Sequence, residues 1–100
     1  MTNAEKTLLL EKAKVALRVM THAFDEEILD LIAAGEENLQ TRGVVVSVTP
    51  LVMRNIITYV RMNFGDPSDY ERLKESYDEQ LGQLMTTTGY TVWEGSNGSD

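Results

Sequence analysis

The amino-acid sequence predicts an all-α protein, a small single domain of four helices with an extended C-terminal segment. Its 100 residues supply the chain for one domain. Four segments place apolar residues three and four positions apart, which is the spacing of one helix face, and breaks rich in Gly, Pro or Asp separate the later ones. We expect the helical domain to cover residues 1–88 and the extended or disordered tail to cover residues 89–100.

The first helix is predicted to begin near Thr2, because Thr2 and Glu5 have the spacing of a capping box. Thr7 is an alternative start, since the three leucines that follow it blur the apolar face. The apolar side chains expected on the buried face are Leu9, Ala13, Ala16, Leu17 and Met20.

The second helix has the clearest boundaries. Asp25 is the expected N-cap, two glutamates follow in the first turn, where the helix dipole favours acids, and Gly43 lies just past the end. Its apolar stripe comprises Ile28, Leu31, Ile32, Gly35 and Leu39. A glycine inside a helix costs about 1 kcal/mol relative to alanine, so Gly35 indicates a close crossing with another helix.

The third helix is expected to be the most buried element. Residues 44–48 before it are β-branched and too few for a helix, which predicts an extended connector or a short strand. Thr49 is the expected cap and Pro50 the first helical residue, where a missing N–H costs nothing. Its main apolar face comprises Val52, Ile56, Tyr59, Val60 and Asn63, with Met53, Ile57 and Phe64 beside it.

The fourth helix is predicted to start at Asp66, or at Ser68 with Glu71 completing a capping box. Its narrow apolar stripe comprises Tyr70, Leu73, Tyr77, Leu81 and Leu84. After it, residues 90–93 alternate as a strand would. Tyr90, Val92 and Trp93 either fold back over the core or form an interaction site with another chain, because exposed apolar clusters usually mark such sites.

Charge is segregated along a chain whose formal net charge is -7. Residues 1–20 carry +2, 21–43 carry -5, 44–64 carry +2, 65–85 carry -4 and 86–100 carry -2. These segments are either solvated helix faces or surfaces that pair with opposite charge within the chain or between subunits. An acidic surface repels phosphate, so tight binding of nucleic acid is not expected.

The remaining composition narrows the chemistry further. The absence of Cys excludes disulfides and thiolate chemistry and fits a reducing compartment. The sequence contains no apolar run long enough for a membrane span and no secretion signal, which predicts a cytoplasmic location unless a larger particle carries the protein.

The sequence predicts no catalytic, cofactor-binding or metal site. His22, the single imidazole, is expected at the surface, and the acids around Asp25 lack the pattern of a calcium loop. Glu36 and Glu37 point in different directions on one helix, so we expect a solvated face rather than an acid–base pair. The methionines expected to fill core or interface gaps are Met20, Met53, Met62 and Met85.

The candidate functional residues are therefore interface residues. Arg54 and Arg61 lie seven residues apart on one face of the third helix. They either pair with acids of the second or fourth helix or bind an acidic neighbour. The other candidates are Tyr90, Val92 and Trp93.

Four segments, in order, carry a resemblance to a known family: "KVALRVM", "DEEILDLIAAGEENL", "TPLVMRNIITYVRMNFGDP" and "YERLKESYDEQLGQL". Together, over about residues 9–93, they resemble the small helical head–tail connector proteins of long-tailed bacteriophages, the DNA-packaging adaptors beneath the portal. Residues 44–48 correspond least. The hydrophobic patterns and caps that carry the resemblance include no catalytic signature.

The resemblance implies a ring of about twelve subunits that extends the portal channel. Its partners would be the portal protein and the tail-side head-completion proteins, and DNA would pass through the channel without specific binding. The implied location is the head–tail interface of the virion, with the host cytoplasm during assembly, and the implied role is structural, with no cofactor.

Two other function classes remain open. An acidic DNA mimic or regulatory inhibitor would present carboxylates on one continuous face as a monomer or dimer, whereas a connector needs two different faces for its ring neighbours. A DNA-recognition subunit of a packaging enzyme is the least favoured, because the net charge is -7.

Overall fold

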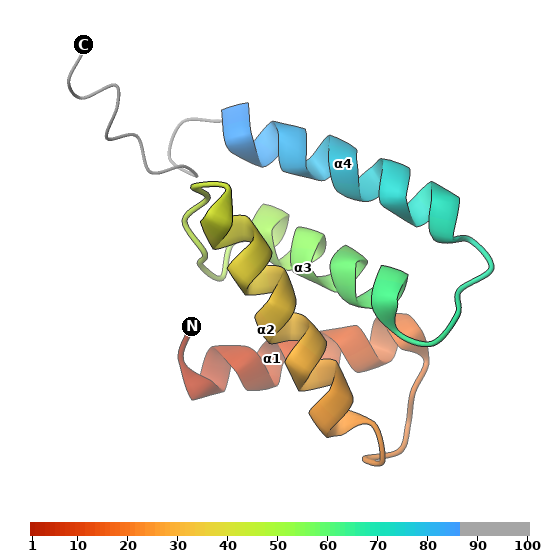
Figure 1. Cartoon of the computed structure of the whole chain (residues 1–100). Helices are drawn as coiled ribbons and strands as arrows, with labels where there is room; N and C mark the ends of the chain where they lie inside the picture. The colour runs from red at the N-terminus through yellow and green to blue at the C-terminus, as the bar shows by residue number, and fades with distance from the viewer. Residues whose placement is uncertain (87–100) are drawn as a thin grey trace, which may run out of the picture.

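The protein is represented by a computed structural model that describes residues 1–86, and these residues form four α-helices (Figure 1). The helices are α1 (Asn3–Leu17), α2 (Asp25–Thr41), α3 (Pro50–Asn63) and α4 (Tyr70–Thr86). The predicted all-α fold is confirmed. The predicted tail lies outside the described residues. None of the helices within residues 1–86 is long and apolar enough to cross a membrane.

Helix α3 occupies the centre, as the sequence predicted. It packs against α1, α2 and α4, whereas α4 packs mainly against α3. The apolar stripes of the four helices meet in one core, whose fully buried members include Leu9, Ala13, Ile28, Ile32, Leu39, Val52, Ile56, Val60 and Leu84. Residues 44–48 form the non-helical connector into α3, and Val44 at its start is buried.

Helix α1 begins with the predicted capping box. The Thr2 hydroxyl accepts a hydrogen bond from the Glu5 N–H, and the Glu5 carboxylate accepts one from the Thr2 N–H. Two residues of the expected buried face are instead exposed, Ala16 and Met20. For Met20 the reason is that Arg18 takes a left-handed conformation with φ 61°, which ends α1 before the stripe reaches it.

Helix α2 differs from the prediction at its start. Phe24 occupies the N-cap position and Asp25 is the first helical residue, so the expectation that Asp25 caps the helix was wrong. The Asp25 carboxylate instead binds the Lys14 ammonium, at 2.7 Å, and the His22 ring. This contact ties the end of α1 to the start of α2, and it takes the carboxylate away from the helix amides.

Gly35 confirms the predicted close crossing. A Cβ atom at this position would lie 3.3 Å from Cδ2 of Tyr59, tighter than an ordinary van der Waals contact, so a larger side chain would push against the Tyr59 ring. Helix α2 also contains a buried acidic residue that the sequence did not predict. Glu36 is only 8% exposed, although a solvated face was expected, because it follows Ile32 by four residues and precedes Leu39 by three on the core side. Glu37 is exposed.

Helix α4 starts later than either predicted site. Gly65 adopts φ 67° and Pro67 follows it, and the chain becomes helical only at Tyr70. Tyr70 is exposed rather than part of the buried stripe, which consists of Leu73, Tyr77, Leu81 and Leu84. Asn63, expected on the apolar face of α3, is likewise exposed, and Asn55 is buried instead.

Candidate protein-interaction groove

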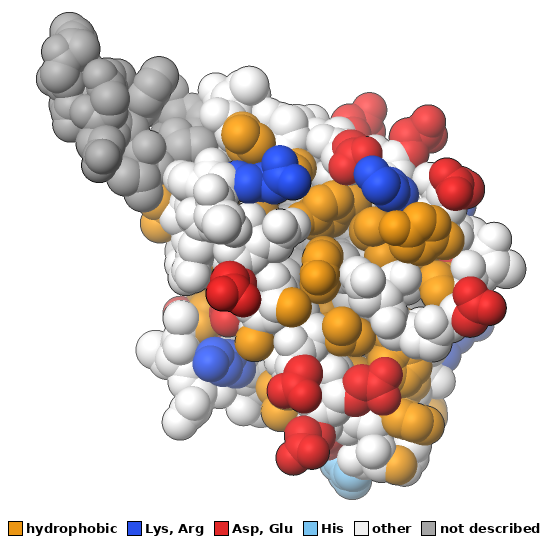
Figure 2. All heavy atoms as spheres, in the orientation of Figure 1, with side chains coloured by type: hydrophobic (Ala, Val, Ile, Leu, Met, Phe, Trp, Pro, Cys, Tyr) orange, Lys and Arg blue, Asp and Glu red, His pale blue; other side chains and the backbone are white. Residues whose placement is uncertain are grey.

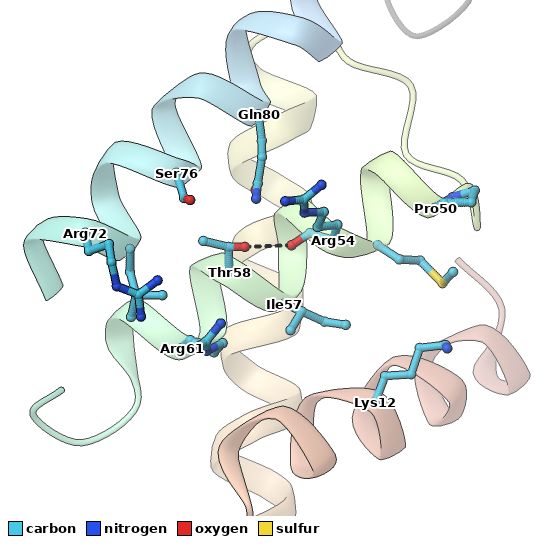
Figure 3. Close-up of a pocket in the computed structure, with 11 residues that line it drawn as sticks. Lys12, Pro50, Arg54, Ile57, Thr58, Arg61, Arg72, Ser76 and Gln80 are labelled. Atoms are coloured by element: carbon cyan, nitrogen blue, oxygen red, sulfur yellow. Dashed lines mark hydrogen bonds between the residues drawn. The ribbon is translucent and has the colours of Figure 1, made fainter. Parts of the chain in front are cut away.

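A groove of about 560 Å³ runs along the outer side of α3, between α1 and α4 (Figure 3). We call it the basic groove, because four of its lining residues are Lys or Arg and none is Asp or Glu. Its lining residues are Lys12, Pro50, Met53, Arg54, Ile57, Thr58, Arg61, Arg72, Leu73, Ser76 and Gln80. This concentration of positive charge is notable in a chain with a net charge of -7.

Helix α3 supplies the two arginines that the sequence singled out. Arg54 and Arg61 are seven residues apart, which is about 10 Å along a helix and close to two full turns. Both therefore line the same groove, with Ile57 and Thr58 between them. The Thr58 hydroxyl donates to the Arg54 carbonyl at 2.9 Å, so it is satisfied within its own helix (Figure 3).

The two arginines differ in their partners. The guanidinium of Arg61 lies 4.0 Å from the carboxylate of Asp69, which also binds Arg72 at 2.5 Å. Arg54 is exposed and makes no ion pair within residues 1–86, and the same holds for Lys12. Asp69 thus partly neutralises one end of the groove, and the Arg54 end keeps its full positive charge.

A buried polar pair lies behind the groove. Asn55 is 1% exposed, and its side-chain amide donates to Gln80 Oε1 at 3.4 Å, the long end of the hydrogen-bond range. The Asn55 Oδ1 atom has no partner among the described residues. Sequence reasoning missed both side chains, although the position of Asn55, three after Val52 on an apolar face, was a usable signal.

The opposite side of α3 belongs to α2, which contacts it through Gly35, Ile56 and Tyr59. The face that α2 turns to solvent carries several acidic side chains with apolar and uncharged ones between them (Figure 2). Its exposed residues at helical spacing are Glu26, Asp30, Ala33 and Glu37. The outward side of α4 is a second acidic surface, with Glu71, Glu75, Asp78 and Glu79 exposed.

Exposed apolar side chains lie on α1 and just after it. Val15 of α1 is 78% exposed next to Lys12 and Ile57 of the groove, and Met20, after the end of α1, is 93% exposed. His22, which lies in the same region, stays at the surface with its Nδ1 atom 3.0 Å from Asp25. Within residues 1–86 no cluster of three or more His, Asp or Glu side chains could hold a metal ion. Tyr90, Val92 and Trp93, the other interface candidates, lie outside the described residues.

Comparison with known families finds a match that covers most of the chain. Residues 9–91 match a family described as phage connector protein, so the match begins within α1 and includes α2, α3 and α4 completely. Comparison with curated proteins and with solved structures gives no match.

Proposed function

This chain belongs to the phage connector protein family, and on that premise we propose that it is the head–tail adaptor of a tailed phage, forming a ring beneath the portal during DNA packaging and head completion. The family is one of structural proteins, and membership implies a position in the virion and contact with other phage head and tail proteins. The ring, its place under the portal and its assembly in the host cytoplasm are the proposal.

The observation that best supports a ring is the distribution of charge around α3. The basic groove lies on one side of α3, and the exposed acids of α2 lie on the other. A subunit with two different and complementary sides can join its neighbours head to tail, and such contacts close into a ring when the rotation permits. Rings of about twelve copies are what the resemblance to head–tail connectors implies.

The channel of the ring is proposed to be acidic. DNA phosphates that pass a positively charged lining would form salt-sensitive contacts that must break again. Carboxylates repel the DNA backbone and form no such contacts. The exposed acids of α2 or α4 would supply this lining, and the bases would face neighbouring subunits. In this proposal the ring binds no specific DNA sequence and catalyses no reaction.

The C-terminal residues Tyr90, Val92 and Trp93 are proposed to contact a neighbouring subunit or a partner protein. Large aromatic side chains bury much apolar area, which can offset the entropy lost when an extended segment becomes ordered. Together with the portal, the tail-side head-completion proteins are the expected partners.

The test of this function is a mass measurement of the free protein, followed by a second measurement after addition of portal protein. We expect a ring on the portal, and anisotropy with labelled linear duplex DNA at about 0.1 M salt should show no binding by that ring. Micromolar binding that weakens steeply with salt would contradict the proposal. The alternative, an acidic DNA mimic, predicts a monomer or dimer that inhibits a DNA-binding enzyme, and the basic groove argues against it.

A further inference from the structure

We propose that the basic groove of one copy binds α2 of a second copy, with Asp30 and Glu37 of the second copy facing Arg54 and Arg61 of the first. This inference rests on the proposed ring, because it names the contact between adjacent subunits. The occupant of the groove is thus another copy of this chain, and the contact surface is one helix laid against α3 between α1 and α4.

The spacing of the charges matches across the two helices. Asp30 and Glu37 are seven residues apart on α2, as Arg54 and Arg61 are on α3, so both pairs span about 10 Å on one helix side. Both acids are exposed and make no ion pair within residues 1–86. Each acid can therefore meet one arginine when the helices pack side by side.

The residues between the charges also fit. Ala33 and Ala34 lie between the two acids, and Ile57 and Thr58 lie between the two arginines. Small side chains on α2 let its backbone approach the apolar floor of the groove, to the 8–10 Å between axes that packed helices require. Ala33 is exposed in the monomer, so it is free to contact a neighbour.

The acidic side of α4 fits the groove less well than α2. Glu71 and Asp78 are also seven residues apart, but Lys74 and Glu75 stand between them. Lys74 would bring a positive charge against the arginines, and it already binds Asp78 at 3.0 Å. The long side chains would also hold the two backbones apart. We therefore assign the contact to α2, which leaves the acids of α4 for the channel.

The placement of the two surfaces allows continuous assembly. Figure 3 shows α2 behind α3 when the groove faces the viewer. A copy that receives a neighbour's α2 in its groove thus keeps its own α2 uncovered for the next copy. The contact is heterologous, as a ring requires.

A protein occupant is favoured over nucleic acid by the groove itself. Asp69 pairs with Arg61 and Arg72, so that end of the groove has less positive charge to offer than a row of successive phosphates would need, whereas the proposed contact brings a single carboxylate to each arginine. The floor contains Met53, Ile57 and Leu73, apolar side chains that gain from contact with alanines and not with a sugar–phosphate chain.

The test is a reciprocal charge reversal. One variant carries Arg54→Glu with Arg61→Glu, the other carries Asp30→Arg with Glu37→Arg, and circular dichroism verifies that both fold. Sedimentation velocity should show self-association weakened at least about tenfold in each variant alone, because like charges then face each other. An equimolar mixture should recover association, since every contact in an alternating assembly again joins opposite charges.

The matched control reverses α4 in the same way, with Glu71→Arg and Asp78→Arg. When this control is mixed with the variant that carries Arg54→Glu and Arg61→Glu, association should not recover. If it restores association and the α2 variant does not, the inference is overturned in favour of α4. If the free wild-type chain binds labelled duplex DNA through the groove, with loss on Arg54→Glu and Arg61→Glu, the groove is a nucleic-acid site and the inference is overturned.

Cross-linking supplies a second measurement that tolerates weak association. The chain has no Cys, so single cysteines can be introduced without background. Ala33→Cys mixed with Ser76→Cys, which lies in the groove, should give a dimer with a short bis-maleimide. Ala33→Cys mixed with Glu75→Cys, on the outer side of α4, should give at least about fivefold less.

The outcomes separate the inference from the proposed function. If rings form on the portal even with the charge-reversal variants, and Ala33→Cys gives no cross-linked dimer with Ser76→Cys, the inference is overturned. The connector role would then still stand. A wild-type chain that forms no oligomer, alone or with portal protein, and no cross-linked dimer would overturn both.

Discussion

Replacement of Asn55 by leucine should stabilise the protein. The side chain is 1% exposed in the middle of α3, and its Oδ1 atom has no hydrogen-bond partner among residues 1–86. Its one bond, to Gln80, is 3.4 Å long and therefore weak. Leucine has the same branching and the same number of side-chain heavy atoms, so Asn55→Leu replaces two polar atoms with two methyl groups.

The expected gain is about 1–2 kcal/mol in the free energy of unfolding. An unsatisfied buried acceptor costs roughly 1–3 kcal/mol, and removing it recovers that amount. Burial of the methyl groups adds about 1.5 kcal/mol. Three effects oppose this gain: the hydrogen bond to Gln80 is lost, the Gln80 amide loses its partner, and steric crowding costs up to roughly 1–3 kcal/mol. Gln80 borders the groove, so its amide can turn towards water.

Urea unfolding followed by circular dichroism measures this change. The midpoint should rise with an unchanged slope, and Tm should rise by roughly 4–8 °C for each kcal/mol. Asn55→Ala is the control, because it also removes the polar group but leaves a cavity, and it should give no gain. A loss of more than about 1 kcal/mol in Asn55→Leu would refute the reasoning and show that Asn55 is satisfied in solution.

Three further predictions concern other parts of the molecule. Gly35→Val should destabilise the fold by about 2 kcal/mol because its side chain would enter the Tyr59 ring, whereas Gly82→Ala, at an open helical position, should stabilise it by roughly 0.5–1 kcal/mol; thermal unfolding of both tests the α2–α3 crossing. The hydrogen bond from Lys14, and then that from His22, hold the pKa of Asp25 below its usual 3.8, so this contact stabilises the fold above that pH and is lost as the pH falls through the lowered value. Asp25→Asn should accordingly be less stable at neutral pH, and its free energy of unfolding should fall less steeply than that of the wild type as the pH drops below about 4. An equally steep fall in the variant would show that the Asp25 contact does not cause the acid sensitivity. Truncation after Thr88 should leave helicity intact and abolish attachment to the portal; full attachment of the truncated chain would rule out a docking role for Tyr90, Val92 and Trp93.

The helices were predictable because their signals are local. Thr2 with Glu5, Pro50, and the apolar stripe of α2 act within a few residues of chain, and the structure contains all three. The errors occur where another helix decides the outcome. Asp25 is the first residue of α2 and its carboxylate binds Lys14 of α1, and the packing of α2 places Glu36 in the core.

The groove was only partly predictable for the same reason. The seven-residue spacing of Arg54 and Arg61 was visible within one helix. Lys12 and Arg72 come from helices that are distant in sequence, and only the packing of α1 and α4 on α3 brings them beside the arginines. The pattern within α3 therefore identified two of the four basic residues of the groove. The other two could be assigned to it only from the tertiary structure.

The attachment of α4 mainly to α3 has a consequence for how the molecule opens. One hydrogen bond, from Asn38 to the Tyr77 hydroxyl, joins α4 to α2, so α4 is the helix that can detach while the other three stay packed. Its backbone amides should exchange with deuterium sooner than those of α3, through a partial opening that costs less than global unfolding. Because α3 and α4 both line the groove, an occupant that contacts both helices holds α4 against α3. Slower exchange in α4 then becomes a reporter of assembly that needs no label on the protein.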